Sequence, residues 1–117
     1  MKTAPGWLRT ASASYVVSEP NGAHGWLASN DHPSDKARFT FRVDVPEGLT
    51  AAANGRLASS TTSAGRTTWV WEGDRPMATY LATVSIGPYR VVDAGTTGGG
   101  VRIRHVVPAA NEAAYTA

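Results

Sequence analysis

Three carboxylates and two histidines lie within residues 19–35, although only 17% of the 117 residues are charged. The carboxylates are Glu19, Asp31 and Asp35, and the histidines are His24 and His32. Imidazole nitrogens and carboxylate oxygens bind metal ions, and carboxylates also bind ammonium groups through charge-assisted hydrogen bonds. The segment is also rich in turn-forming residues. It therefore predicts either a ligand site or an elaborate connector.

A metal site is the first chemical interpretation of this segment. His24, Asp31 and His32 have side chains that suit zinc. However, the adjacent Asp31 and His32 would point to opposite sides of an extended chain, and no third ligand has a characteristic spacing. In the alternative interpretation, both aspartates accept local backbone N–H groups or pair with the basic residues that follow, Lys36 and Arg38.

The composition favours a single all-β domain. A chain of 117 residues can bury one hydrophobic core and is too short for two. Its 12 glycines and 7 prolines, with many Thr, Ser and Val residues, are typical of strands and turns. There is no cysteine, which excludes disulfides and thiolate zinc sites.

The charge pattern excludes some classes of partner. The net charge is only +2, and the arginines are scattered singly among apolar positions, which argues against nucleic acid as a partner. No apolar run approaches the length of a membrane-spanning helix, so we expect no membrane partner. The sequence leaves the cellular location undetermined, since either a cytoplasmic or a secreted protein fits it.

Alternation of apolar and polar residues predicts an antiparallel β-sandwich or a saddle-like sheet. The clearest strand is ARFTFRVDVP at residues 37–46, where Phe39, Phe41, Val43 and Val45 share one face. Asn54-Gly55 predicts a hairpin turn. We expect further strands at residues 49–53, 55–60, 66–73, 77–94 and 101–108, and a polar tip at residues 61–65.

Several residues have positions that can be predicted from this pattern. Gly87-Pro88 interrupts the longest strand and predicts a bend or bulge. Trp69 and Trp71 are two residues apart and are expected to pack in the core, and His105 is expected to point inward with its apolar neighbours. Residues 109–117 predict a short C-terminal helix.

Five short blocks stand in a fixed order: SEP at 18–20, DHPSDKARF at 31–39, VPEG at 45–48, NG at 54–55 and PMATYL at 76–81. This order resembles the N-terminal β domain of the aminopeptidase N-type zinc metallopeptidases, the gluzincins. The resemblance runs from about Tyr15 to Tyr89. The sequence departs from the family pattern at Val17, where the family usually has Gln, and at His32, the middle residue of its D-E-P block.

The resemblance implies a role for Glu19. In the family, the acid of the E-P block helps to hold the free α-ammonium group of a peptide substrate, and Glu19 stands at that position. Val17, His24 and Trp26 would be cleft residues beside it. Neither H-E-x-x-H nor G-x-M-E-N occurs in the chain, so the resemblance implies no metal site and no catalysis here, with zinc held in the catalytic domain of a parent enzyme.

The resemblance also implies a domain organisation. Residues 1–14 would be a leader segment or a first strand, residues 15–108 the β domain, and residues 109–117 the start of a linker or helix to the catalytic domain. The implied partners are a peptide substrate and that catalytic domain. A homodimer formed through exposed strand edges is also expected.

Two alternatives remain open at this point. The first is a stand-alone β-sandwich that binds carbohydrate or mediates protein adhesion, in which Trp26 would stack on a sugar. The second is an inactive relative of the peptidases that acts as a scaffold, an interpretation that Val17 favours.

Overall fold

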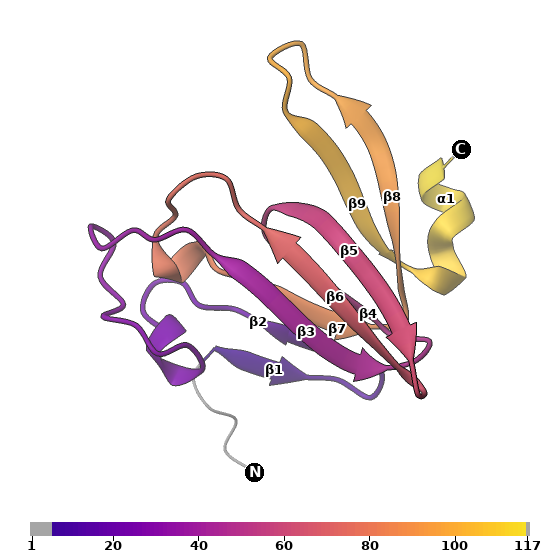
Figure 1. Cartoon of the computed structure of the whole chain (residues 1–117), viewed down its shortest axis with the longest axis horizontal. Coiled ribbons are helices and arrows are strands. Elements are labelled where there is room, and N and C mark those ends of the chain that lie inside the picture. The colour runs from indigo at the N-terminus through magenta and orange to yellow at the C-terminus, as the bar shows by residue number, and fades with distance from the viewer. Residues whose placement is uncertain (1–5, 117) are drawn as a thin grey trace.

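The computed structural model describes residues 6–116, which form two packed sheets, a separate two-stranded ribbon and a short C-terminal helix (Figure 1). The strands are β1 (Trp7–Arg9), β2 (Ser14–Val16), β3 (Thr40–Pro46), β4 (Thr50–Ala53), β5 (Arg56–Ser63), β6 (Arg66–Glu72), β7 (Val84–Gly87), β8 (Tyr89–Thr96) and β9 (Arg102–Pro108). The short helices are the 3-10 turns η1 (Ala23–Gly25), η2 (Thr79–Leu81) and η3 (Ala109–Asn111), followed by α1 (Glu112–Thr116). The predicted all-β class with a short C-terminal helix is confirmed.

All strand pairs are antiparallel. One sheet has the order β1-β2-β7-β4, the other has the order β3-β6-β5, and β8 pairs with β9 alone. Within residues 6–116, no helix is long and apolar enough to cross a membrane. The first five residues of the segment predicted as a leader or first strand, residues 1–14, and the last residue of the predicted linker lie outside the described residues.

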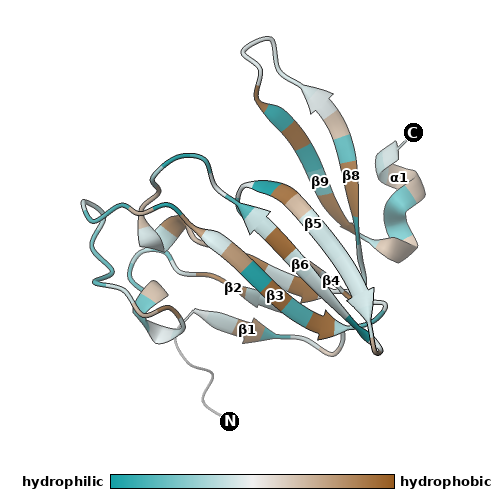
Figure 2. Cartoon of the chain, in the orientation of Figure 1, coloured by the Kyte–Doolittle hydropathy of each residue, from teal (hydrophilic) through white to brown (hydrophobic). Residues whose placement is uncertain are grey.

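The hydrophobic core lies between the two sheets. Along β3 the apolar side chains turn inward, with Phe41 and Val45 buried, while Arg42 and Asp44 are exposed, as the alternation predicts (Figure 2). Both sheets contribute to the central cluster. Its buried members are Val16, Phe41, Ala52, Trp71, Ala82 and Val84.

Trp71 joins the two sheets directly. Its side chain is 1% exposed, and its indole N–H donates a hydrogen bond of 2.8 Å to the carbonyl oxygen of Ala51 on β4. Because β4 has small side chains, alanines, at positions 51–53, there is room for a large indole to pack against the strand. The predicted core position of Trp71 is confirmed, and Trp69 also packs against the core, partly buried.

The hairpin predicted at Asn54-Gly55 is wrong, because this turn carries the chain from one sheet to the other. β4 pairs with β7, whereas β5 pairs with β6. The Asn54 side chain is engaged far along the chain: its amide donates to the carbonyl oxygen of Leu81 at 3.1 Å and its oxygen accepts from the backbone N–H of Thr83 at 2.7 Å. Tertiary contacts therefore decide the path of this turn.

The strand predicted across residues 77–94 is only partly present. Residues 77–83 are not a strand: Met77 makes an isolated bridge with Ala37, and the 3-10 turn η2 follows with Ala78 and Ala82 buried on either side. The predicted break at Gly87-Pro88 is confirmed, because β7 ends at Gly87 in one sheet and β8 begins in the ribbon. The alternation of apolar and polar residues in this segment therefore does not mark a strand.

Two smaller expectations also fail. β5 extends to Ser63, so the polar tip is only Ala64-Gly65, both with positive φ, in a tight two-residue hairpin. His105 is exposed, and Arg104 is instead the half-buried residue of β9. The ribbon pairs with neither sheet and projects from the sandwich (Figure 1). Val101 and Ile103, on the same face as His105, are therefore exposed too, and only nearer the sandwich is Val107 buried.

Gly55 offers a test of the sheet crossing. Its φ is +96°, and a Cβ there would lie 2.2 Å from the carbonyl oxygen of Glu72. Gly48 has a similar φ of +92° with no atom within 4 Å of a Cβ. We expect Gly48→Ala to lower the free energy of unfolding by about 1 kcal/mol, the cost of the left-handed conformation alone.

Gly55→Ala should cost roughly 1–3 kcal/mol more than Gly48→Ala, because the Glu72 backbone must also move. Urea denaturation of the two variants, followed by tryptophan fluorescence, measures the difference. Equal losses would contradict the close approach at Gly55.

Candidate functional site

Glu19 lies in the connector between β2 and η1 and is exposed. Its predecessor Ser18 is 4% exposed and Val17 is 52% exposed, so the chain dips into the core just before the acid. The Glu19–Pro20 peptide bond is cis. No ion pair within residues 6–116 includes Glu19. Its carboxylate is therefore presented to solvent from a partly buried backbone.

Two contacts hold the connector on either side of Glu19. The backbone N–H of Gly22 donates to the carbonyl oxygen of Ser18 at 2.6 Å, which closes the turn. The indole N–H of Trp26 donates to the Ser18 hydroxyl at 2.9 Å, and Trp7 on β1 stacks on Trp26 with ring centroids 6.1 Å apart. The turn is thus fixed to the first strand of the four-stranded sheet.

Asp31 links the connector to η2. One carboxylate oxygen accepts from His24 Nδ1 at 2.7 Å and from the His24 backbone N–H at 3.2 Å, and the other accepts from the Thr79 hydroxyl at 3.1 Å. The Asp31 side chain is 5% exposed. The hydrogen bond from the His24 side chain, partly opposed by burial, lowers the pKa of Asp31 below its usual value. Asp31 is thus a structural anion.

The expectations for the two aspartates are met only in part. Asp31 does accept a local backbone N–H. Asp35 instead accepts from the side-chain amide of Asn30 at 2.7 Å, and neither aspartate forms an ion pair with Lys36 or Arg38 within the described residues. The aspartates hold the loop together through neutral donors and one histidine.

The proposed metal ligands are not brought together. His24 contacts Asp31, but His32 Nδ1 lies 2.7 Å from the hydroxyl of Ser34. In the part of the chain that the structure describes, no group of three or more His, Asp or Glu side chains is placed to hold a metal ion. The residues present do not fit a zinc site.

The predicted cleft residues lie around the connector without forming one cavity. Val17 is exposed beside Glu19, whereas His24 and Trp26 are engaged with Asp31 and Ser18. A cavity of about 550 Å³ next to this region includes none of the predicted site residues. Its lining consists of Leu27, Ala28, Ser29, Asn30, Asp35, Ala37, Phe39 and Thr79.

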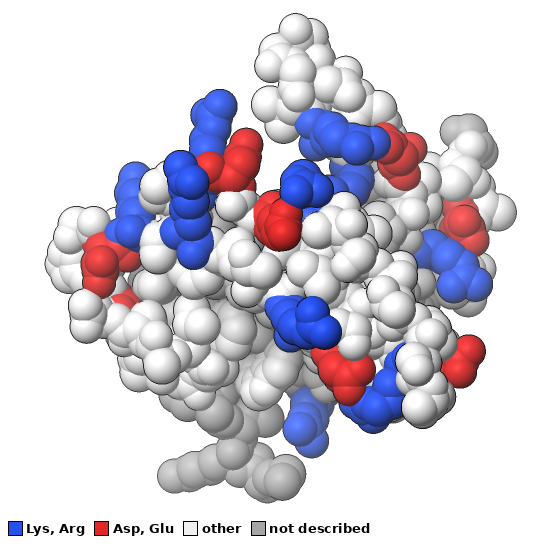
Figure 3. All heavy atoms as spheres, viewed as in Figure 1, with Lys and Arg blue, Asp and Glu red and all other residues white. Residues whose placement is uncertain are grey.

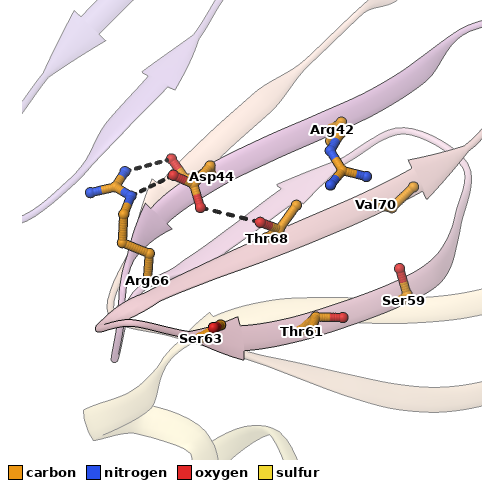
Figure 4. Close-up of a pocket in the computed structure, with 8 residues that line it drawn as sticks. All are labelled: Arg42, Asp44, Ser59, Thr61, Ser63, Arg66, Thr68 and Val70. Atoms are coloured by element: carbon orange, nitrogen blue, oxygen red, sulfur yellow. Dashed lines mark hydrogen bonds and ion pairs between the residues drawn. The ribbon is translucent and has the colours of Figure 1, made fainter.

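A smaller pocket of about 200 Å³ lies on the outer face of the β3-β6-β5 sheet (Figure 4). There Arg66 and Thr68 both donate to Asp44, and the hydrogen bond from Arg66 is the main reason that the pKa of Asp44 lies below its usual value. Acidic and basic side chains are interspersed over this side of the molecule (Figure 3). The pocket is a solvated, internally paired sheet face, which sequence analysis had not singled out.

Asp31 provides a prediction about acid stability. Because its pKa is lowered in the folded chain, the stabilisation that it gives is complete above its ordinary pKa of 3.8 and is lost as the pH falls through the folded value. We expect Asp31→Asn to lower the free energy of unfolding at neutral pH, with the difference from the wild type shrinking below about pH 4.

Denaturant unfolding of both proteins from pH 7 to pH 2 measures this difference. Asp74→Asn is the control, because Asp74 is exposed and belongs to no ion pair within the described residues. A difference between wild type and Asp31→Asn that is independent of pH would contradict the role of the carboxylate.

Comparison with known proteins identifies the family. Residues 12–81, more than half of the chain, match the family described as the Peptidase M1 N-terminal domain. Among proteins of curated function, no sequence matches the chain.

Solved structures agree with this family. An M1 zinc metallopeptidase from Deinococcus radiodurans superposes with a TM-score of 0.79 at 38% identity, covering 87% of this chain and 24% of that enzyme. A mutant M1 zinc metallopeptidase from the same organism, bound to a Tyr-Ser-Ala substrate, gives a TM-score of 0.81 at 39% identity over the same shares.

Legionella pneumophila aminopeptidase A in complex with aspartic acid shares the fold, with a TM-score of 0.71 at 21% identity, over 94% of this chain and 14% of that protein. The present chain therefore spans about a quarter of the Deinococcus enzymes that it matches. The matched residues include the Glu19 connector, β3 to β6 and η2. The chain belongs to the M1 peptidase family, as a representative of its N-terminal β domain.

Proposed function

We propose that this chain is the non-catalytic N-terminal part of a longer zinc aminopeptidase, in which Glu19 binds the α-ammonium group of the peptide substrate. The observation that carries the proposal is the exposed carboxylate of Glu19 on a connector fixed on both sides. Residues 15–108 would be the β domain, and residues 109–117 would lead to the catalytic domain.

The chemistry of an ammonium group suits this arrangement. An ammonium offers three N–H donors, and each hydrogen bond to a carboxylate oxygen is charge-assisted. The Glu19 carboxylate has no cation to displace within the described residues, so ligand binding need not break an internal ion pair. A stiff connector would hold the substrate N-terminus at a fixed place, and hence its first peptide bond at a fixed distance from the catalytic groups of the parent enzyme.

The hydrolytic step itself would depend on other residues. This chain contains neither H-E-x-x-H nor G-x-M-E-N, and its described side chains do not fit a zinc ion. Zinc, where the parent enzyme uses it, would be bound by the catalytic domain that its M1 relatives contain. The Deinococcus relative bound to Tyr-Ser-Ala supports a peptide as the substrate.

The three predicted cleft residues, Val17, His24 and Trp26, would have different roles. Val17 is exposed next to the acid and would line the cleft directly. His24 and Trp26 would act mainly as supports, because their polar atoms are bonded to Asp31 and Ser18. These bonds and the stacking on Trp7 leave Trp26 poorly suited to a sugar platform, so the structure lends no support to the carbohydrate-binding alternative.

The role of Glu19 is tested in the full-length protein. We expect Glu19→Gln to lower kcat/KM for a peptide with a free N-terminus by roughly 10- to 100-fold, the worth of one or two charge-assisted hydrogen bonds. The same variant should have little effect on hydrolysis of the N-acetylated peptide, which has no ammonium group. Steady-state kinetics with both peptides measures the selectivity.

Glu47→Gln is the matched control, since Glu47 is an exposed glutamate in the turn after β3. Glu19 has no such role if its variant loses the same factor for both peptides or behaves like the control. An inactive wild type would instead favour the pseudo-peptidase alternative.

We also propose that two copies of this chain pair through β5. This eight-residue strand bonds to β6 on one side and has no partner on the other within the described residues. Its central residues from Ser59 to Thr62 are uncharged and exposed. The other edge strand of that sheet, β3, carries Arg42, Asp44 and Pro46, which are typical of a protected edge.

Thr61→Lys tests this pairing, because two lysines would approach each other in an antiparallel β5–β5 contact. We expect the wild type to show a concentration-dependent dimer in sedimentation equilibrium, and Thr61→Lys to weaken the dimer by tenfold or more. Thr40→Lys adds the same charge on β3 and should leave the dimer intact. A wild type that is monomeric at all concentrations would exclude the proposal.

A further inference from the structure

The fold gathers four arginines around one cavity, although they are scattered along the sequence. The cavity has a volume of about 580 Å³, within the roughly 300–1,000 Å³ of small-molecule sites. Three separate segments line it: the sheet crossing before β5, the end of β6, and β9 with the tip of the ribbon. The arginines are Arg56, Arg75, Arg102 and Arg104.

Arg104 is held firmly at the base of this cavity. Its guanidinium lies over the Trp71 ring, 4.9 Å from the ring centroid, and donates to the carbonyl oxygen of Gly55. No carboxylate in the described residues forms an ion pair with it. Its direct contacts are a carbonyl oxygen and a ring face, and the cross-strand carboxylate of Asp93 attracts it without forming an ion pair.

The other charges leave the cavity positive. Arg56 is paired with Glu72 at 2.5 Å, and Arg102 is paired with Asp93 at 2.5 Å. Arg75, like Arg104, has no ion-pair partner within residues 6–116. Of the two lining carboxylates, only Asp74 is left unpaired. The two guanidiniums without ion pairs therefore exceed the one unpaired lining carboxylate by one positive charge, and Asp93, outside the lining, also attracts Arg104.

The opposite wall adds backbone donors. Gly99 and Gly100, at the tip of the ribbon, line the cavity without side chains. The N–H of Gly100 already donates to the carbonyl oxygen of Thr97 at 2.9 Å, so the peptide N–H of Gly99 is the backbone donor that an anion can approach closely. Basic side chains, with acidic ones between them, lie where the ribbon rises from the sandwich (Figure 3). Guanidinium forks with peptide N–H groups are the donor set that binds tetrahedral oxyanions.

We propose that this cavity binds a phosphate group, either free or as a phosphate monoester, with Arg75 and Arg104 as its main ligands. Phosphate binding here is independent of the proposed role of Glu19, because Glu19 lies in the connector between β2 and η1 and does not line this cavity. Trp71 and Gly55 would hold the Arg104 guanidinium in place before the anion binds. The side chain of Arg75, which is exposed, would contact the anion from the solvent side.

The test uses the 117-residue chain and inorganic phosphate at constant ionic strength, with sodium chloride as the balancing salt. We expect saturable binding in isothermal titration and a matching shift of the Gly99 amide signal in NMR spectra. Titration with phosphoserine in a parallel arm distinguishes a monoester from the free ion by its higher affinity. Phosphate that acts no differently from chloride would overturn the proposal.

Three variants make the test specific. Arg75→Gln should weaken phosphate binding by about tenfold or more, the worth of one charge-assisted contact, whereas Asp74→Asn should strengthen it several-fold by removing repulsion. Arg66→Gln is the control, because Arg66 pairs with Asp44 on the outer sheet face. Equal effects of the two arginine variants, or weaker binding by Asp74→Asn, would assign any binding to overall charge and reject the site.

Discussion

Burial of Trp71 between the two sheets is the interaction on which the rest of the structure depends. The indole is the largest fully buried side chain, and it needs both an apolar surrounding and an acceptor for its N–H. Ala51 satisfies both needs, since its small side chain leaves room and its carbonyl oxygen accepts at 2.8 Å. An indole confined in this way fixes the spacing of β6 from β4, and hence of one sheet from the other.

The position of the Glu19 connector depends on this packing. β2 pairs with β7, and β7 pairs with β4, so the strand that leads into the connector belongs to the sheet that Trp71 contacts. The connector then folds so that Trp26 stacks on Trp7, and both rings pack against the core. Its polar groups are satisfied locally by Ser18 and Asp31. A carboxylate can remain exposed there because the surrounding loop needs no help from it.

Sequence reasoning succeeded where one strand or one turn carries the whole signal. The alternation in residues 37–46 predicted β3, which covers residues 40–46, and the break at Gly87-Pro88 was also found, because each depends on local backbone geometry. It failed where distant contacts decide. The Asn54-Gly55 turn has hairpin chemistry, yet its asparagine bonds to Leu81 and Thr83, nearly thirty residues away. Similarly, the connector could be recognised from its residues, but the partners of its aspartates could not.

The cavity lined by four arginines also could not be predicted from the sequence. Separate arginines in a sequence predict a solvated surface, because spacing says nothing about which turns will meet. Here the sheet crossing at Gly55 and the ribbon strand β9 come together beside Trp71, and Arg104 covers one face of the indole. A single buried ring thus has two consequences. It holds the sandwich together, and it orients a guanidinium that forms no ion pair within residues 6–116.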